Sequence, residues 1–411
     1  LYDTLVNTTD TVQVVSYTFT PHIDPGDGDG ECGGGVDTTI YVWVNPQHKI
    51  VVAAYDTLCY DGDTEFTITT PNNTTRTWRY DLDVVLPSGV TTTLLCDFDL
   101  TSPWLYDTLV NTTDTVQVVE YTFTPHIDPG DGDGECGNGV DTTIYIWVNP
   151  QPKIDVVADD TLCYDGTTDF TVTTPNNSTG AWRYDIDVTV PAGVTSSLGD
   201  TTNLSPGVIS TSLVNTTDTV QVVEYRFIPH IDPGDGDGEC GGGVDTTIYI
   251  WVNPQPKIDV VVDDTLCFDG TTQFDISTPN NTTGTWRYDL EGVLPDSVTN
   301  VLGDAFDLTD LTLYDTLVNT SRNVRVVEYR FTPHIDPGDS DGECADGIDT
   351  TIFVYINPQP EILVSVDDTL CHDGTTEFTI TNPNTSTGEW HYDLTVTVPS
   401  GVNNILTTAT D

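Results

Sequence analysis

The chain is one sequence repeated four times, and this repeat limits the possible fold more than any other feature. The segment LVNTTDTVQVV begins at Leu5, Leu109 and Leu213, and a diverged copy begins at Leu317. A period of 104 residues is that of a β-sandwich domain and is too long for the unit of a short solenoid. The same period separates the members of two cysteine series: Cys32, Cys136, Cys240 and Cys344, and Cys59, Cys163, Cys267 and Cys371.

Within each repeat, apolar and polar residues alternate with the period of two that indicates β-strands. In residues 78–84, Trp78, Tyr80, Leu82 and Val84 alternate with charged residues. The segment TTIYVWV from Thr38 places its isoleucine and valines on one face and its tyrosine and tryptophan on the other. Threonine, valine and tyrosine favour strands, while Pro-Asn-Asn, Asp-Gly and Asn-Pro mark turns. The pattern predicts an all-β fold without a helix of ordinary length.

Three motifs carry a resemblance to a known family. TTIYVWVNPQHKI from Thr38, DTLCYDG from Asp56 and the strand headed by Trp78 resemble the PKD-like, immunoglobulin-like modules of very large Bacteroidota-type extracellular surface proteins. The resemblance covers the whole chain, copy by copy. It implies tandem immunoglobulin-like (PKD-like) β-sandwich domains in an elongated array. Such modules serve as spacers, adhesin stalks or carbohydrate-facing units rather than as enzymes.

In that family the Asn-Pro-x-Pro segment closes one domain and opens the next. This implies complete β-sandwich modules at 47–150, 151–254 and 255–358. Residues 1–46 then form the C-terminal half of a module and residues 359–411 the N-terminal half, each completed by a neighbour. Either the sequence is a window of a longer array, or the half-module at one subunit's C-terminus completes the half-module at the next subunit's N-terminus, which gives a filament. The alternative is four closed domains that begin near Leu1, Leu105, Ile209 and Leu313.

The net charge of the chain limits the kinds of partner that it can bind. Its 65 acidic and 11 basic residues give a formal net charge of −54. Such a field repels nucleic acid and anionic membranes, attracts divalent cations and holds chains apart. No apolar run is long enough to cross a bilayer. The expected partner is therefore a copy of the chain itself or a continuation of its repeats, with covalent glycans as a further addition.

Two cysteines per repeat in an acidic, threonine-rich chain indicate disulfides and an extracellular or cell-surface location. A turn at Asn45–Pro46 would bring Cys32 opposite Cys59, whereas an extended joint there would favour Cys59 with Cys136. A bridge contributes about 3–4 kcal/mol per module in the chain-entropy model. Cys96 has no counterpart in the other copies. The disulfide candidates are Cys32, Cys59, Cys136, Cys163, Cys240, Cys267, Cys344 and Cys371.

The loop HIDPGDGDGEC, residues 22–32, recurs in every repeat with acids alternating with glycines. Oxygen ligands at this spacing suit Ca²⁺, which accepts six to eight oxygens in loose geometry. A solvated acidic turn is the alternative, and zinc is disfavoured because no CxxC pair is present. The calcium candidates are Asp24, Asp27, Asp29, Glu31, Asp128, Asp131, Asp133, Glu135, Asp232, Asp235, Asp237, Glu239, Asp336, Asp339, Asp341 and Glu343.

Two sugar-attachment patterns recur along the chain. Asn-x-Ser/Thr sequons recur at the LVNT lead-in and the Pro-Asn-Asn turn, and Asp-Thr before Leu, Val or Thr is similar to the O-glycosylation signal of Bacteroidota surface proteins. Both patterns also suit turns and strands without any sugar. The candidate acceptors are Asn7, Asn73, Asn111, Asn177, Asn215, Asn281, Asn319 and Asn384, and Thr4, Thr11, Thr38, Thr57, Thr108, Thr115, Thr142, Thr161, Thr219, Thr246, Thr265, Thr316, Thr350 and Thr369.

The sequence predicts a structural protein rather than an enzyme. It has no nucleophile elbow, phosphate-binding glycine loop or HExxH motif, so no catalytic residue is assigned. The predicted function is that of a subunit of an extracellular bacterial filament or surface stalk. The alternative is a cell-surface adhesin or carbohydrate-binding repeat protein. An exposed row that contains Tyr41 and Trp43 and their copies would favour this alternative, whereas a buried row would count against it.

Overall fold

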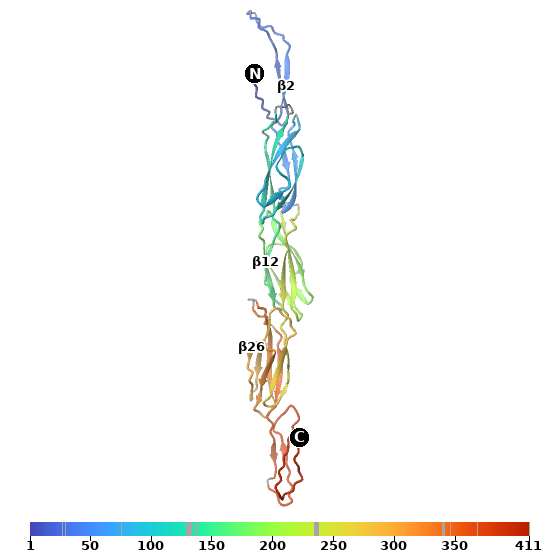
Figure 1. The fold of residues 1–411 in the computed structure, drawn as a ribbon, viewed down its shortest axis with the longest axis vertical. Coiled ribbons are helices and arrows are strands. Elements are labelled where there is room, and N and C mark those ends of the chain that lie inside the picture. The colour runs from blue at the N-terminus through green and yellow to red at the C-terminus, as the bar shows by residue number, and fades with distance from the viewer. Residues whose placement is uncertain are drawn as a thin grey trace.

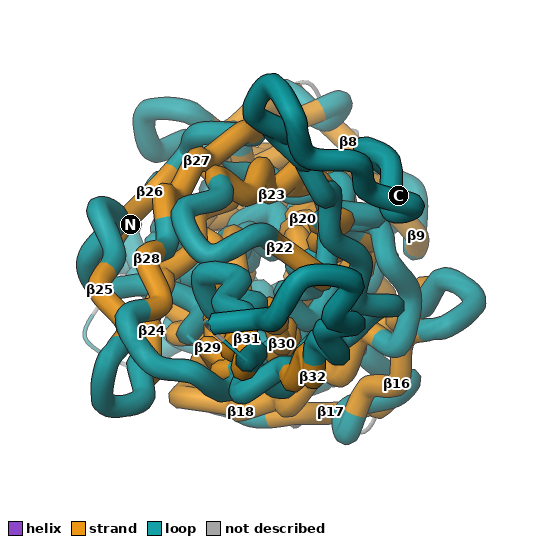
Figure 2. The backbone as a smooth tube through the Cα atoms, turned by 90° about the horizontal axis from the view of Figure 1, so that it is seen from below, coloured by secondary structure: helices purple, strands orange, loops and turns teal. Residues whose placement is uncertain are grey.

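The computed structural model describes residues 1–26, 28, 30–74, 76–128, 134, 136–137, 139–233, 238–338, 342–345, 347–367 and 369–410. The described residues form strands and turns but no helix. The molecule is a long rod, with β-sandwiches stacked end to end (Figure 1). Seen along the rod axis, the sandwiches overlap within one roughly round outline (Figure 2). The predicted all-β array of immunoglobulin-like β-sandwiches is confirmed.

The first sandwich packs a four-stranded sheet, in the order β3-β5-β9-β7, against a five-stranded sheet, in the order β4-β11-β10-β6-β8. The four-stranded sheet contains β3 (Val51–Ala53), β5 (Asp61–Thr69), β9 (Trp104–Asn111) and β7 (Val90–Thr92). The five-stranded sheet contains β4 (Thr57–Leu58), β11 (Thr142–Val148), β10 (Gln117–Ile127), β6 (Trp78–Val85) and β8 (Asp97–Leu100).

The second sandwich repeats this plan, with sheets β12-β14-β18-β16 and β13-β20-β19-β15-β17. The smaller sheet contains β12 (Asp155–Val157), β14 (Thr167–Thr173), β18 (Gly207–Asn215) and β16 (Val194–Ser196). The larger sheet contains β13 (Thr161–Leu162), β20 (Thr246–Val252), β19 (Gln221–Asp232), β15 (Ala181–Thr189) and β17 (Thr201–Leu204).

The third sandwich differs because the strand that is continuous as β9 and β18 is split into two. Its smaller layer is formed by β21-β23-β27 and β25-β28, and its larger sheet has the order β22-β30-β29-β24-β26. The smaller layer contains β21 (Asp259–Val262), β23 (Thr271–Ser277), β27 (Thr312–Thr316), β25 (Val298–Thr299) and β28 (Val318–Asn319). The larger sheet contains β22 (Thr265–Leu266), β30 (Thr350–Ile356), β29 (Arg325–Asp336), β24 (Thr285–Val293) and β26 (Ala305–Leu308).

Alternating side chains from both sheets fill each core, as the period of two predicts. In the first sandwich Tyr80, Phe66 and Phe123 are fully buried, and the Phe66 ring centroid lies 4.7 Å from that of Tyr121. The three cores contain residues from 50–148, 154–252 and 258–356. Each core therefore combines the beginning and the end of one stretch between two Asn-Pro segments.

The two ends of the chain are built differently. Residues 1–46 form one hairpin of β1 (Gln13–Phe19) and β2 (Thr38–Val44), and residues 359–411 pair β31 (Leu363–Ser365) with β32 (Thr379–Thr381). We call these stretches the N-terminal and C-terminal segments. They extend from opposite ends of the rod (Figure 1).

Candidate functional site

The joints between successive units are the places where side chains of different repeats meet. Joint 1 lies between the N-terminal segment and the first sandwich, and joint 4 between the third sandwich and the C-terminal segment. At joint 2 the Lys153 ammonium lies 2.6 Å from Asp114 Oδ1, and at joint 1 Lys49 lies 3.2 Å from Asp10. Lys257 and Asp218 form the same pair at joint 3. All these groups are exposed, so each pair contributes only about 0–1 kcal/mol.

Joint 4 keeps this ion pair with its charges exchanged. Arg322 replaces the aspartate and Glu361 replaces the lysine, and Arg322 Nε lies 3.0 Å from the Glu361 carboxylate. Attraction is retained because both partners change sign. The same side-chain contact is therefore present at all four joints.

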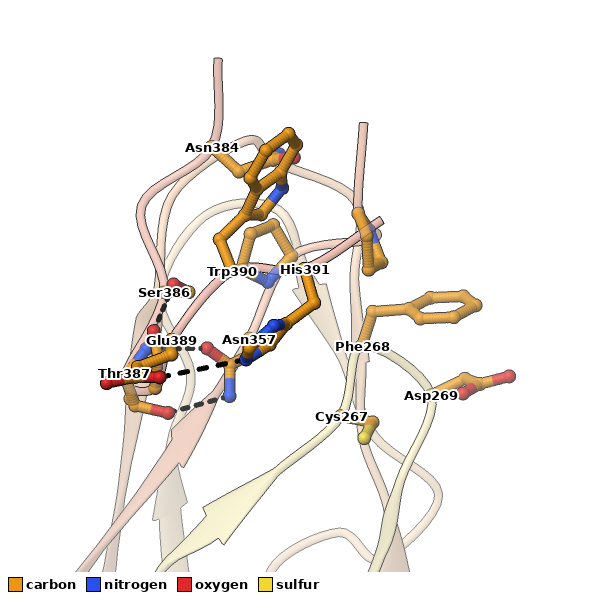
Figure 3. A pocket seen from close by; sticks show the side chains of 13 residues that line it. Cys267, Phe268, Asp269, Asn357, Asn384, Ser386, Thr387, Glu389, Trp390 and His391 are labelled. Atoms are coloured by element: carbon orange, nitrogen blue, oxygen red, sulfur yellow. Dashed lines mark hydrogen bonds and ion pairs between the residues drawn. The ribbon is translucent and has the colours of Figure 1, made fainter. Parts of the chain in front are cut away.

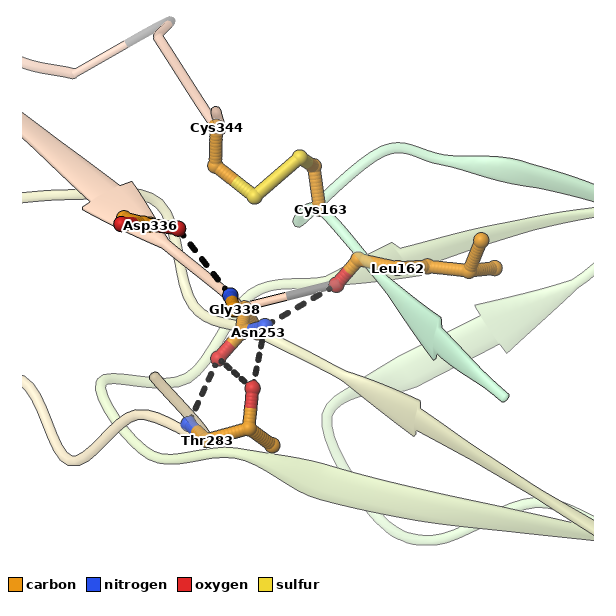
Figure 4. Close-up of a disulfide and its surroundings, with 7 residues drawn as sticks. All are labelled: Leu162, Cys163, Asn253, Thr283, Asp336, Gly338 and Cys344. Carbon is orange, nitrogen blue, oxygen red and sulfur yellow. Dashed lines mark hydrogen bonds between the residues drawn. A yellow bond between two sulfur atoms is a disulfide. The ribbon is translucent and has the colours of Figure 1, made fainter. Parts of the chain in front are cut away.

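An asparagine side chain links the two units at joints 2, 3 and 4, and at joints 2 and 3 it is fully buried. Asn253 Nδ2 donates to Leu162 O at 3.3 Å in its own sandwich and to Thr283 Oγ1 at 2.9 Å in the next (Figure 4). Asn253 Oδ1 accepts from the Thr283 backbone N–H at 3.0 Å. Because the side chain is fully buried, breaking these bonds would leave unpaired polar atoms. The family resemblance implied a domain boundary at this Asn-Pro, but nothing in the sequence indicated that the asparagine amide joins two domains.

Asn149 and Asn357 make the same contacts at joints 2 and 4. Asn149 bonds to Leu58 O and Thr179, and Asn357 bonds to Leu266 O and Thr387. Main-chain pairing adds to this, since the Asn177 N–H donates to Asp114 O at 3.0 Å across joint 2. Each joint is thus held by the main chain as well as by side chains.

Disulfides connect neighbouring sandwiches. Cys59 bonds to Cys240 and Cys163 bonds to Cys344, each pair being separated by 181 residues in the sequence. Figure 4 shows Cys344 reaching Cys163 of the preceding sandwich. The expectation that Cys59 pairs with Cys32 or Cys136 is therefore wrong, because the loops of the second and third sandwiches each extend backward to the sandwich before them.

Strand extension explains this reach. β29 continues to Asp336, beyond the end of its partner β30, and Ile335 then pairs with Cys344 as an isolated antiparallel bridge. This narrow hairpin carries Cys344 onto the loop after β13, where it is buried. The same Ile–Cys bridge occurs at Ile231 and Cys240. Among the described cysteines, Cys32, Cys96, Cys136, Cys267 and Cys371 are exposed and belong to neither disulfide.

Cys96, the cysteine without counterparts, lies on the outer side of the first sandwich. Its thiol donates to Asp83 Oδ1 at 3.1 Å, and its sulfur accepts from the Val84 N–H at 3.3 Å. These contacts are local to one sandwich and cross no joint.

The acidic loops are only partly described. The described acids make local contacts, such as Asp24 and Asp336 accepting N–H bonds from Gly26 and Gly338, and they form no cluster of three ligands within the described residues. Calcium binding at these loops therefore stays a prediction. Nine of the calcium candidates lie outside the described residues: Asp27, Asp29, Asp131, Asp133, Glu135, Asp235, Asp237, Asp339 and Asp341.

A different acidic group, which the sequence did not suggest, gathers around His334, the buried histidine that opens the acidic loop of the third sandwich. Asp289, Asp307 and His334 place one ligand atom each within 4.8 Å of one another, and His334 Nε2 lies 3.1 Å from Asp307 Oδ1. The corresponding His126–Asp99 contact lowers the pKa of the Asp99 carboxyl, with a further contribution from Arg79. Periodicity could not reveal this group because Asp307 comes from the short edge strand β26, whose pairing with β24 has an irregular register.

The aromatic row predicted on the TTIYVWV strand is exposed in every copy. Tyr145 and Trp147 lie on the outer face of β11 with ring centroids 6.5 Å apart, and Tyr249 and Trp251 repeat this at 6.4 Å. In the last copy Phe353 and Tyr355 occupy the positions. The rod therefore presents one pair of exposed rings per repeat.

The sugar-acceptor candidates fall into two groups. Asn111, Asn215 and Asn319 are buried, and Asn111 Nδ2 donates to Thr115 O and Val148 O at 2.9 Å. An N-linked sugar at these positions would have to break such bonds, so their burial argues against them as acceptors. Asn7 makes the same two bonds while half-buried. Asn73, Asn177 and Asn281 are exposed, Asn384 is half-buried, and none of the fourteen threonine candidates is buried.

Comparisons with known proteins identify no family for the chain. It matches no protein-family model and no curated protein. Among solved structures it resembles invasin, a bacterial integrin-binding protein, at 15% identity and a TM-score of 0.26, over 81% of this chain and 67% of that one. It also resembles a D1–D4 ectodomain fragment of ICAM-5 at 12% identity and a TM-score of 0.31, over 78% of this chain and 80% of the other.

Proposed function

We propose that this chain is a structural subunit of an extracellular filament or surface stalk, assembled head to tail from β-sandwich modules. The observation that carries the proposal is the construction of the joints. Each joint combines a buried asparagine or main-chain bonds with an ion pair, and joints 2 and 3 add a disulfide. Fastening of this kind resists bending and stretching, which a stalk or fibre requires.

The exposed apolar surfaces of the terminal segments support assembly by strand complementation. Phe19 and Phe378 are each 48% exposed, although their copies in the complete sandwiches are fully buried. Each such side chain gains about 1.5–3 kcal/mol on burial. The main chain of β1 also lacks the neighbour that β10 finds in β6. A second copy that supplies these strands would bury both surfaces.

Charge and redox chemistry fit the same role. Disulfides persist in oxidising compartments, so the two bridges support an extracellular location. A net charge of −54 along a rod keeps neighbouring rods apart. No described element is a helix of the length and apolarity needed for a membrane span.

Electron microscopy of the purified chain, together with sedimentation velocity over a range of concentrations, tests the proposal. We expect uniform fibres whose length grows with concentration and whose axial repeat corresponds to four modules. Monodisperse rods of one chain at every concentration would contradict assembly.

A second function, adhesion to carbohydrate, is favoured by the exposed aromatic pairs. Rings such as Tyr145 and Trp147 offer flat faces of the kind that stack on sugars, and repetition along the rod would add avidity. A glycan-binding screen compares the native chain with the double variant Trp147→Ala/Trp251→Ala. Binding that is lost in the variant would support adhesion, and equal binding by both would contradict it.

Calcium and glycans remain part of the proposal. Ca²⁺ at the acidic loops would offset self-repulsion, so a chelator should lower the melting temperature, and an unchanged transition would remove calcium from the proposal. Intact-mass analysis of the native protein tests whether its exposed threonines carry sugar.

A further inference from the structure

We propose that copies of this chain are joined covalently, by a disulfide between Cys267 of one copy and Cys32 of the next, and by a second between Cys371 and Cys136 of the next copy. This inference rests on the proposed head-to-tail assembly. It adds a specific chemical bond, and hence a fixed register, to each contact between copies.

The pairing rule comes from the two disulfides within the chain. Each joins a cysteine of the Cys59 series to the cysteine of the Cys32 series that lies in the next sandwich. Cys267 and Cys371 are the remaining members of the first series. If residues 1–46 of a second copy complete the sandwich that residues 359–411 begin, the same rule leads from Cys267 to Cys32 and from Cys371 to Cys136.

The surroundings of Cys267 match this expectation. At joint 3 the loop of the following sandwich covers Cys163 and buries Cys344 to 3% exposure, whereas Cys267 at joint 4 is exposed. Cys267 borders an open pocket of about 560 Å³ between the third sandwich and the C-terminal segment (Figure 3). The pocket is lined on the other side by Gly388 and Trp390.

The glycine in this pocket shows which segment would enter it. A Cβ built on the equivalent Gly284 would lie only 1.9 Å from Asp336 O and 2.5 Å from Pro337 Cα, because the extended hairpin crosses directly over it. Gly180 lies under Asp232 and Pro233 in the same way, whereas a Cβ built on Gly388 would meet no atom within 4 Å. Asp24 and Pro25 are the matching residues of the N-terminal segment.

Apolar side chains on the two terminal segments would pack together and so position the hairpin of the N-terminal segment over the pocket. In the third sandwich the Phe274 ring lies 4.8 Å from Tyr329 and 5.6 Å from Phe331. The copies of these residues are Phe378 in one terminal segment and Tyr17 and Phe19 in the other. We therefore infer that the N-terminal segment of a second copy occupies the pocket. This segment carries both the strand that would bury these rings and the cysteine that would bond to Cys267.

The bond itself forms by oxidation. The Cys267 and Cys32 thiols each lose a proton and together give up two electrons as one S–S bond forms. A disulfide-carrying oxidoreductase accepts the two electrons and two protons and becomes a dithiol. The Cys32 and Cys267 thiols are both exposed and therefore accessible to this oxidoreductase, and burial after closure protects the product from reduction.

Isotope labelling of the full chain tests the proposal. Unlabelled and ¹⁵N-labelled copies are mixed as reduced monomers, oxidised with a glutathione redox buffer, digested and analysed by mass spectrometry without reductant. We expect Cys267 peptides linked to Cys32 peptides in mixed-isotope pairs, and the same for Cys371 with Cys136. A non-reducing denaturing gel should show a ladder of multimers.

Variants separate this inference from the proposed assembly. Cys267→Ser or Cys371→Ser alone should keep the ladder, since one bridge per contact remains, whereas the double variant should migrate as a monomer yet still form fibres in the microscope. Cys96→Ser is the matched control and should keep both bridges. Fibres of the native chain without these linked peptides, or with the cysteines paired otherwise, would overturn the covalent inference alone. Absence of both fibres and linked peptides would overturn the assembly as well.

Discussion

The complete sandwiches and the terminal segments have closely similar sequences but different structures. Tyr121 and Phe123 are fully buried in the first sandwich, whereas their copies Tyr17 and Phe19 lie at least partly in solvent. In the C-terminal segment Tyr392 is 43% exposed, although its copy Tyr288 is fully buried. The same residues therefore form a core only where both halves of a module are present.

This difference follows from the order of the strands. In the first sandwich β6 pairs with β10, and β4 pairs in parallel with β11. In both pairs a strand from the first half of the module bonds to a strand from its second half. A segment that ends between these strands has its local hairpin but no partner sheet. Stability in this chain depends on contacts that are distant in sequence, which is typical of sandwiches with crossover connections.

The largest effect is expected from truncating matching core rings in the two regions. Phe170→Ala should lower the free energy of unfolding of the second sandwich by about 3–5 kcal/mol, because it leaves a cavity among Tyr225 and Phe227. Phe378→Ala in dispersed chains should cost under about 1 kcal/mol. Urea titration followed by tryptophan fluorescence measures both. Equal losses would show that the C-terminal segment already has a packed core.

Removing one disulfide sharpens the comparison between joints. The double variant Cys163→Ser/Cys344→Ser should lower the stability of joint 3 by about 2–4 kcal/mol, since the bridge restricts the unfolded chain. Calorimetry should show the transition of the third sandwich separating from that of the second. Cys96→Ser serves as the control. A single unchanged transition would mean that the asparagine and main-chain bonds couple the sandwiches unaided.

Alkaline pH should act mainly on the complete sandwiches. Burial raises the pKa of Tyr80 and of Tyr288 to about 12, with a further rise from Asp97 and Asp310. Because the folded pKa lies above the unfolded value near 10, this stability is fully present below pH 10 and is lost as the pH rises through 12. The loss should reach about 2–3 kcal/mol per tyrosine.

Urea unfolding at pH 8 and pH 12 measures this loss. The variant Tyr80→Phe/Tyr288→Phe should lose less stability over that range than the native chain, although it starts lower because Tyr80 Oη no longer donates to Ser102 O. The same loss in the variant would place the alkaline sensitivity elsewhere.

The smallest effect is expected from the ion pairs at the joints. Lys153→Glu should destabilise joint 2 by about 0.5–1 kcal/mol by placing two acids together, and adding Asp114→Arg should restore it, as Arg322 and Glu361 do at joint 4. The difference should shrink in 1 M salt. A double-mutant cycle on the melting temperature measures the coupling, and independent effects would contradict a contact between the pair.

The sequence alone determined the local structure. The period of two at Tyr80 and Leu82 placed these residues in the core, and the repeat of 104 residues indicated sandwiches in tandem. These features are predictable because strand faces and turns depend on neighbouring residues. The outward position of Tyr145 and Trp147 follows from the same alternation.

Only the tertiary structure decided how the units are joined. Cys240 reaches Cys59 because an extended hairpin crosses the joint, and Asn253 bonds to Thr283 because the linker turns inward. The Asp307–His334 contact depends on an irregular edge strand. Each contact brings together residues from separate elements or separate sandwiches. The repeated sequence gives every copy the same strands and turns. Which copy supplies the bonding partner of a residue depends on which elements lie close together in the folded chain.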